Sequence, residues 1–116
     1  MTRSSTDPIP PRAEAREINA ILASVASGDR AAFARLYDSI IGPVFGLIRR
    51  IVRDGAISEE VTQDVMLEVW RMAPRYDPTQ GPGLSWILTI ARRRAIDRVR
   101  SEQASRNRAM RIASEQ

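Results

Sequence analysis

Apolar residues recur at helical spacing along most of this chain. The first such stretch predicts an amphipathic helix that ends at Gly28, because its apolar residues follow an i, i+3, i+4, i+7 pattern at Ile18, Ile21, Leu22 and Val25. Asp29 then predicts the N-cap of a second helix. The apolar positions of that helix are Phe33, Leu36, Tyr37, Ile40 and Ile41, followed by Val44, Leu47, Ile48, Ile51 and Val52. Pro43 lies between the two groups and predicts either a kink or a fresh helix start.

Two further helices and one long loop complete the pattern. Ser58, followed by two glutamates, predicts the N-terminus of a third helix that runs to about Ala73. The prolines and glycines of residues 74–83 predict a loop. A last helix is expected from near Leu84 to at least Arg100. The expected core positions are Val61, Val65, Val69 and Met72 on the third helix, and Leu84, Ile87, Leu88, Ala91, Ala95 and Val99 on the last.

These elements predict an all-α fold, a small bundle of about four helices. Residues 1–12 are polar and proline-rich, which indicates a disordered leader. Residues 13–101 form the helical domain. Residues 102–116 are polar and read as the start of a linker. A length of 116 residues fits one domain.

Composition removes several classes of chemistry. Histidine and cysteine are both absent, which excludes disulfides, Cys/His zinc sites, a Ser-His triad and a thiol nucleophile. Scattered carboxylates alone give no argument for a small hydrolase. We therefore expect no enzyme activity, no catalytic residue, no metal site and no cofactor. No apolar run approaches the roughly 20 residues that span a bilayer, and the first residues lack the apolar stretch of a signal peptide, so we expect a cytoplasmic monomer without membrane insertion.

The distribution of charge points to two different partners. All 18 basic residues are arginine, against 14 acidic residues, and the net charge is +4. From Asp54 to Asp77 six acidic residues meet two arginines, whereas from Arg92 to Arg111 eight arginines meet two acidic residues. The first segment favours a basic partner and the second an acidic one. Arginine suits bidentate contacts to phosphates and base edges.

Each of the last two helices carries a polar face that allows two interpretations. On the third helix this face is either solvated or a docking surface with an apolar anchor; it comprises Glu60, Gln63, Asp64, Leu67 and Glu68. On the last helix, residues predicted to lie opposite the core are Trp86, Ile90, Arg93, Asp97 and Arg100, widened by Arg92, Arg94 and Arg98. This face either stacks on bases and neutralises phosphates, or places Trp86 over a neighbouring helix and leaves the arginines in solvent.

The order of these features resembles region two of a bacterial sigma factor of the extracytoplasmic-function type. The resemblance covers roughly residues 33–101, and its strongest blocks are Phe33–Tyr37, Ser58–Trp70 and Ser85–Arg100. It implies that the polar face of the third helix docks on the clamp helices of the beta-prime subunit of core RNA polymerase. It also implies that the last helix lies along the minus-ten element, with Trp86 at the upstream fork and Ile90 and Arg93 facing base pairs.

The loop is similar to the family's specificity loop, which receives a base flipped from the non-template strand. Its expected pocket residues are Tyr76, Asp77, Thr79 and Gln80. Many members have asparagine at the position of Arg93, so a different base or only a phosphate would be contacted there. Members of the family continue into a second domain that reads the minus-thirty-five element, so this chain looks like an isolated domain. An anti-sigma partner is also implied.

Two other functions remain open from the sequence. A generic duplex-DNA-binding regulator would use the arginines in a major groove, but the ten-residue connection before the last helix is too long for a helix-turn-helix. A protein-interaction module without DNA binding would use the Trp86 face to bind another protein.

Overall fold

The computed structural model describes residues 12–115, which form four α-helices and two short 3₁₀ helices. In chain order these elements are α1 (Arg12–Ala26), α2 (Arg30–Val52), α3 (Gly55–Met72), η1 (Ala73–Arg75), η2 (Pro78–Gln80) and α4 (Gly83–Glu115). No strand occurs within the described range, and the predicted all-α class is confirmed. The expected leader lies outside the described residues except for Arg12, which begins α1.

The junction between α1 and α2 forms as the sequence predicts. Gly28 follows the end of α1 with a φ of 93°, a left-handed conformation that glycine adopts without a steric penalty. The side chain of Asp29 accepts a hydrogen bond from the Ala32 backbone N–H at 3.0 Å. This bond satisfies one of the free N–H groups at the start of α2.

Helix α2 continues through Pro43, so the alternative of a fresh helix start at this residue is wrong. An internal proline removes one backbone hydrogen bond and costs about 3 kcal/mol or more. Leu36 and Ile40 before the proline, and Val44 and Ile48 after it, are all fully buried on one face. Burial of this unbroken stripe outweighs the cost and keeps the two halves in one helix.

Helix α2 is also long and apolar enough, by length and composition, to cross a membrane. Such a helix was not expected from the sequence. In this structure α2 packs against α1, α3 and α4. Packing in the core of the bundle therefore accounts for part of its apolar character.

The start of α3 differs from the prediction. Asp54, not Ser58, is the N-cap, and its side chain accepts a hydrogen bond from the Ile57 backbone N–H at 2.9 Å. The helix begins at Gly55, so Ser58 already lies within it and is fully buried. The Asp54–Gly55 pair therefore begins the helix, and the prediction that Ser58 caps it is wrong.

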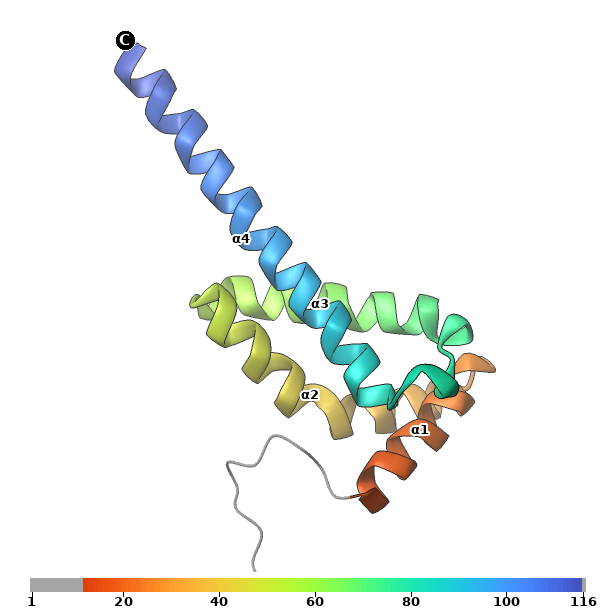
Figure 1. The fold of residues 1–116 in the computed structure, drawn as a ribbon. Helices are drawn as coiled ribbons and strands as arrows, with labels where there is room; N and C mark the ends of the chain where they lie inside the picture. The colour runs from red at the N-terminus through yellow and green to blue at the C-terminus, as the bar shows by residue number, and fades with distance from the viewer. Residues whose placement is uncertain (1–11, 116) are drawn as a thin grey trace, which may run out of the picture.

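The core lies where α2 meets the three other helices (Figure 1). Its largest fully buried apolar side chains come from all four helices: Leu22, Leu36, Ile40, Val44, Ile48, Val65, Val69 and Ile87. Phe33 and Trp70 pack edge to face on each other, with ring centroids 5.3 Å apart, and both lie against this core. The bundle therefore fixes α2, α3 and the first half of α4 relative to one another.

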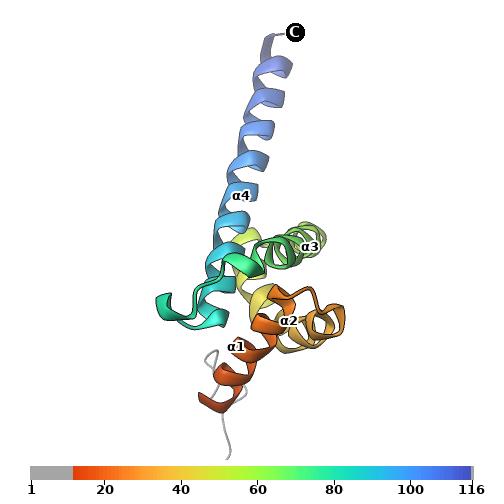
Figure 2. The same ribbon diagram turned by 90° about the vertical axis from the view of Figure 1, so that its right-hand side faces the viewer.

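Helix α4 extends well beyond the bundle, as both views show (Figures 1 and 2). The radius of gyration is 17.0 Å, compared with about 13 Å for a compact domain of 100 residues. Residues 101–115 are helical and almost all exposed. Val99 is exposed rather than part of the core, because it lies where α4 leaves the bundle, and its assignment to the core was wrong. The interpretation of residues 102–116 as a linker stays a prediction.

Candidate functional site

The outward surface of α3 presents an apolar side chain among polar ones. Leu67 is 58% exposed, and Glu60, Gln63 and Asp64 are also exposed. Glu68 differs, because only 14% of its side chain is accessible. Four of the five residues predicted for a docking surface thus lie in solvent, whereas Glu68 is largely covered.

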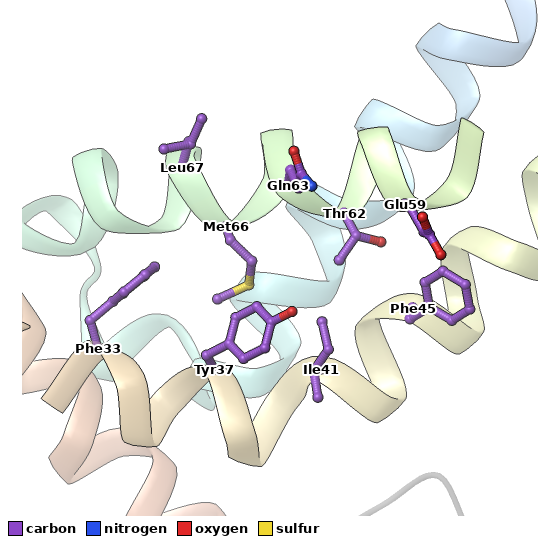
Figure 3. Close-up of a pocket in the computed structure, with 9 residues that line it drawn as sticks. All are labelled: Phe33, Tyr37, Ile41, Phe45, Glu59, Thr62, Gln63, Met66 and Leu67. Atoms are coloured by element: carbon purple, nitrogen blue, oxygen red, sulfur yellow. The ribbon is translucent and has the colours of Figure 1, made fainter. Parts of the chain in front are cut away.

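A groove of about 580 Å³ adjoins this surface between α2 and α3 (Figure 3). Its floor and walls are mostly apolar, and Leu67 stands at its rim, pointing away from α2. The lining residues are Phe33, Tyr37, Ile41 and Phe45 from α2 and Glu59, Thr62, Gln63, Met66 and Leu67 from α3. An apolar groove with a partly polar rim is the kind of surface that accepts a helix from another protein.

The outward surface of α4 is basic and nearly flat. A shallow depression of about 350 Å³ runs along it, lined by Thr89, Arg92, Arg93, Ile96, Asp97 and Arg100. Arg92, Asp97 and Arg100 are exposed as predicted. Ile90 is only 7% exposed and belongs to the core, so its predicted position opposite the core is wrong. The start of α4 packs against α1 as well as against α2 and α3, which widens the buried arc of the helix.

Trp86 lies against the loop that precedes α4. Its ring centroid is 5.4 Å from that of Tyr76, and both half-buried rings pack against the core. The ring thus covers Tyr76 of the loop, whereas the alternative interpretation had placed it over a neighbouring helix. The rest of the ring remains accessible at the junction of the loop and α4.

Ion pairs join α4 directly to α3. Glu68 of α3 accepts hydrogen bonds from two arginines of α4: Arg93, and Arg94 with an Nε–Oε1 distance of 2.6 Å. Arg98 donates to Glu60 of α3 at 2.7 Å. Residues predicted for one interface are thus paired with residues predicted for the other.

Arg98 also donates to Glu102, one helical turn further along α4, at 2.8 Å. The hydrogen bonds to Glu102 and Glu60 raise the pKa of Arg98 above its usual value. Its guanidinium therefore stays charged at every accessible pH.

The loop before α4 is held by its own side chains. The Tyr76 hydroxyl donates to the Gly81 carbonyl at 2.6 Å, and Asp77 Oδ1 accepts from both the backbone N–H and the hydroxyl of Thr79, at 2.9 and 2.7 Å. The bonds from Thr79 lower the pKa of Asp77, whereas burial and the Asp77 charge raise the pKa of Tyr76. Gln80 is exposed in the same loop.

The family follows from comparison with known proteins. Residues 36–105, which include most of α2, all of α3 and the bundled part of α4, match the family of sigma-70 region 2. The chain belongs to this family. The resemblance drawn from the three sequence blocks is thereby confirmed.

The chain is also similar to curated sigma factors. It is 56% identical over 98 residues to the ECF RNA polymerase sigma factor SigK of Mycolicibacterium vanbaalenii, which covers 84% of this chain and 50% of that protein. The SigK protein of Mycobacterium ulcerans is 50% identical over 104 residues, covering 90% of this chain and 56% of that protein. That of Mycobacterium tuberculosis H37Rv is 49% identical over 105 residues with the same coverage. The chain spans about half the length of these relatives.

Two features of this sigma-70 region 2 chain were missed in the sequence. The α2 wall of the groove comes from a second apolar stripe of spacing four, Phe33, Tyr37, Ile41 and Phe45, beside the fully buried stripe. Two parallel stripes exceed what one core face needs, and this excess was a readable signal. The pairing of Glu60 and Glu68 with arginines of α4 left no such signal, because it depends on how the two helices cross. Among residues 12–115, no three His, Cys, Asp or Glu side chains are grouped so as to hold a metal ion.

Proposed function

We propose that this chain binds core RNA polymerase through α3 and the non-template strand of the promoter minus-ten element through α4 and the loop before it. In this role it would open promoter DNA during transcription initiation. The observation that carries the proposal is the exposed Leu67, set beside an apolar groove and acidic residues on a helix that adjoins the arginine-rich α4. The relatives named above are RNA polymerase sigma factors, which supports the same role.

The polymerase interface combines an apolar anchor with a charged rim. Leu67 supplies the anchor, and Glu60, Gln63 and Asp64 surround it on exposed turns of α3. Apolar anchors within polar rims carry most of the binding energy at protein interfaces. The family resemblance supports the clamp helices of the beta-prime subunit as the partner, and the groove between α2 and α3 widens the surface that a helix could contact.

The DNA interface combines stacking surfaces with cations. Arg92, Arg93 and Arg100 line the depression on α4, and Trp86, three residues before the first lining residue Thr89, lies against Tyr76 of the loop. Arginines in this position neutralise phosphates, and an aromatic ring at the loop offers a surface for an unstacked base. Extruding a base costs a few kcal/mol, which new stacking and hydrogen bonds offset, so no ATP is needed. Ile90 has no part in this interface because it is buried.

The remaining attributes follow from this role. Binding to polymerase places the chain in the cytoplasm, and its action is binding and strand opening rather than enzymatic turnover. An anti-sigma protein is the expected regulator, and the monomer is the expected state. Binding to duplex DNA alone would instead favour the generic regulator.

The polymerase half of the proposal is tested with Leu67→Ala. Ile112→Ala is a matched control, because Ile112 is also 58% exposed but lies on the part of α4 that projects beyond the bundle. The fluorescently labelled chain is titrated with purified core RNA polymerase, and anisotropy gives the Kd. We expect Leu67→Ala to weaken binding by at least about fivefold and Ile112→Ala to leave it unchanged. Equal affinity of all three proteins, or no binding of the unsubstituted chain, contradicts the α3 assignment.

A further inference from the structure

The first turn of α4 is capped by a residue from the opposite end of the sequence. Helix α4 begins at Gly83, directly after Pro82, whose side chain has no hydrogen-bond acceptor. The first N–H groups of a helix need acceptors from outside the helix. The Gly83 N–H donates to Oδ1 of Asn19, a residue of α1, at 2.7 Å. Asn19 thus supplies, across the fold, the cap that the local sequence lacks.

The end of the loop packs closely against α1. Gly83 is buried, and a Cβ atom on it would lie 2.9 Å from Asn19 Oδ1 and 3.0 Å from Leu22 Cδ2. A larger residue here would force the ends of the Asn19 and Leu22 side chains to shift and so disturb the bond to Asn19. The path of the chain out of the loop is therefore fixed against α1.

The other end of the loop is fixed by Tyr76. Its ring packs against Trp86 and the core, and its hydroxyl holds the carbonyl of Gly81, whose φ is 138°. Figure 2 shows the short loop between these two anchors projecting beside the start of α4. The two anchors adjoin at the base of the loop, since a Cβ atom on Gly83 would lie 3.7 Å from the Tyr76 hydroxyl oxygen, and together they hold the two ends of the loop.

Most polar side chains of the loop form hydrogen bonds within the loop, and one does not. Tyr76 bonds to Gly81, and Asp77 and Thr79 bond to each other. In the described part of the chain, the exposed side-chain amide of Gln80 has no hydrogen-bond partner. An amide presents both a donor and an acceptor, which suits the edge of a nucleobase.

We propose that Asn19 is a positioning residue that holds the loop of residues 76–82 so that Gln80 can read an unstacked base. This inference rests on the proposed function, because it assumes that the loop receives a base. Asn19 lies in α1, away from the arginines of α4, and acts through the Gly83 N–H rather than by touching DNA. Its loss therefore weakens the discrimination between bases at the position that the loop reads, while the phosphate contacts that supply most of the affinity remain.

The test compares the full chain with Asn19→Ala, Asn19→Asp and Gln80→Ala. The aspartate retains an oxygen acceptor for the Gly83 N–H, and Asn107→Ala is a control with the same change on the exposed part of α4. Selection from a pool of labelled single strands first yields the preferred motif. Four oligonucleotides that differ at one base of the motif are then titrated at low salt, for each base in turn. Amide hydrogen exchange at Gly83 is followed without DNA.

We expect the unsubstituted chain to discriminate by roughly 5- to 150-fold at the base read by the loop, as a bidentate contact does. Gln80→Ala identifies that base, because its discrimination disappears there. In Asn19→Ala the discrimination at that base falls to within about threefold and Gly83 exchanges faster, while mean affinity changes little. Asn19→Asp restores both properties, and Asn107→Ala changes neither.

Three results overturn the inference and separate it from the proposed function. If Asn19→Ala keeps full discrimination although Gly83 exchanges faster, Asn19 only caps the helix. If the exchange of Gly83 is unchanged, Asn19 is not its anchor. If the unsubstituted chain shows no base preference on single strands, the proposed DNA function itself fails. The proposed role of Asn19 in base discrimination then fails with it.

Discussion

Replacement of Ser58 by alanine should stabilise this protein. Ser58 is fully buried, and its hydroxyl oxygen lacks a hydrogen-bond partner in the described chain. A buried polar group left without a partner costs about 1–3 kcal/mol. Alanine also favours the interior of a helix over serine by about 0.5 kcal/mol. Against these gains stands only the small packing loss of one oxygen atom.

The expected gain in the free energy of unfolding is therefore about 1–2 kcal/mol. For a domain of this size each kcal/mol moves the thermal midpoint by about 4–8 °C. Urea unfolding followed by circular dichroism at low protein concentration gives the change, with an unaltered m-value as evidence that the denatured state is the same. Ser39→Ala is the control for helix preference, because Ser39 is exposed in the middle of α2; it also loses the exposed bond from its hydroxyl to the Arg35 carbonyl, so the gain there should be smaller than at Ser58.

The sign of the result separates the structure from the prediction made on the sequence. If Ser58 capped α3, its removal would destabilise the protein by about 0.5–2 kcal/mol. In the structure that loss belongs to Asp54→Ala, which removes the acceptor of the Ile57 N–H. A less stable Ser58→Ala together with a neutral Asp54→Ala would refute the reasoning.

Three further predictions concern the ion pairs, the core and the loop. Glu68→Gln removes the carboxylate that holds two arginines, so the affinity for single-stranded DNA should rise. The slope of log K against log salt should steepen by about 0.7 for each additional phosphate contact. A weaker affinity would show instead that Glu68 orients the arginines for DNA. Ile48→Ala should lower the free energy of unfolding by about 2–5 kcal/mol in urea, and a loss below 1 kcal/mol would contradict its full burial. Because the pKa of Tyr76 is raised, the stabilisation from its hydroxyl is complete below pH 10, the ordinary pKa, and is lost only as pH rises through the raised value. In a Trp70→Phe background, which leaves Trp86 as the reporter beside Tyr76, tryptophan fluorescence should change above pH 10 and not below it. The same change should not occur in Tyr76→Phe.

Local signals in the sequence were sufficient where a single residue type decides the conformation. Gly28 ends one helix in a left-handed conformation, and Asp29 caps the next helix with its side chain. Both predictions were confirmed. At the start of α3 the prediction was wrong, because Asp54 caps the helix four residues before Ser58. The choice depends on where burial of the apolar face of α3 begins, which the local sequence does not contain.

Features that depend on how the helices cross could not be predicted from the sequence. The buried position of Ile90 reflects a core that wraps further around α4 than a regular helical projection allows, because α4 meets three other helices. The pairs between α3 and α4 likewise require two side chains, 25 to 38 residues apart, to meet across a packed interface. The charge pattern predicted an acidic surface on α3 and a basic surface on α4, whereas the ion pairs between them depend on how the two helices pack.

The most direct test of the central claim is fluorescence anisotropy of this chain with a pool of labelled oligonucleotides, single-stranded and duplex in parallel at low salt. Arg100→Ala serves as the interface variant, because Arg100 is exposed beside the depression on α4. The account predicts selective binding of single strands that share a short motif, weakened by this substitution. Binding to duplex DNA alone, or no binding to either form, would contradict it.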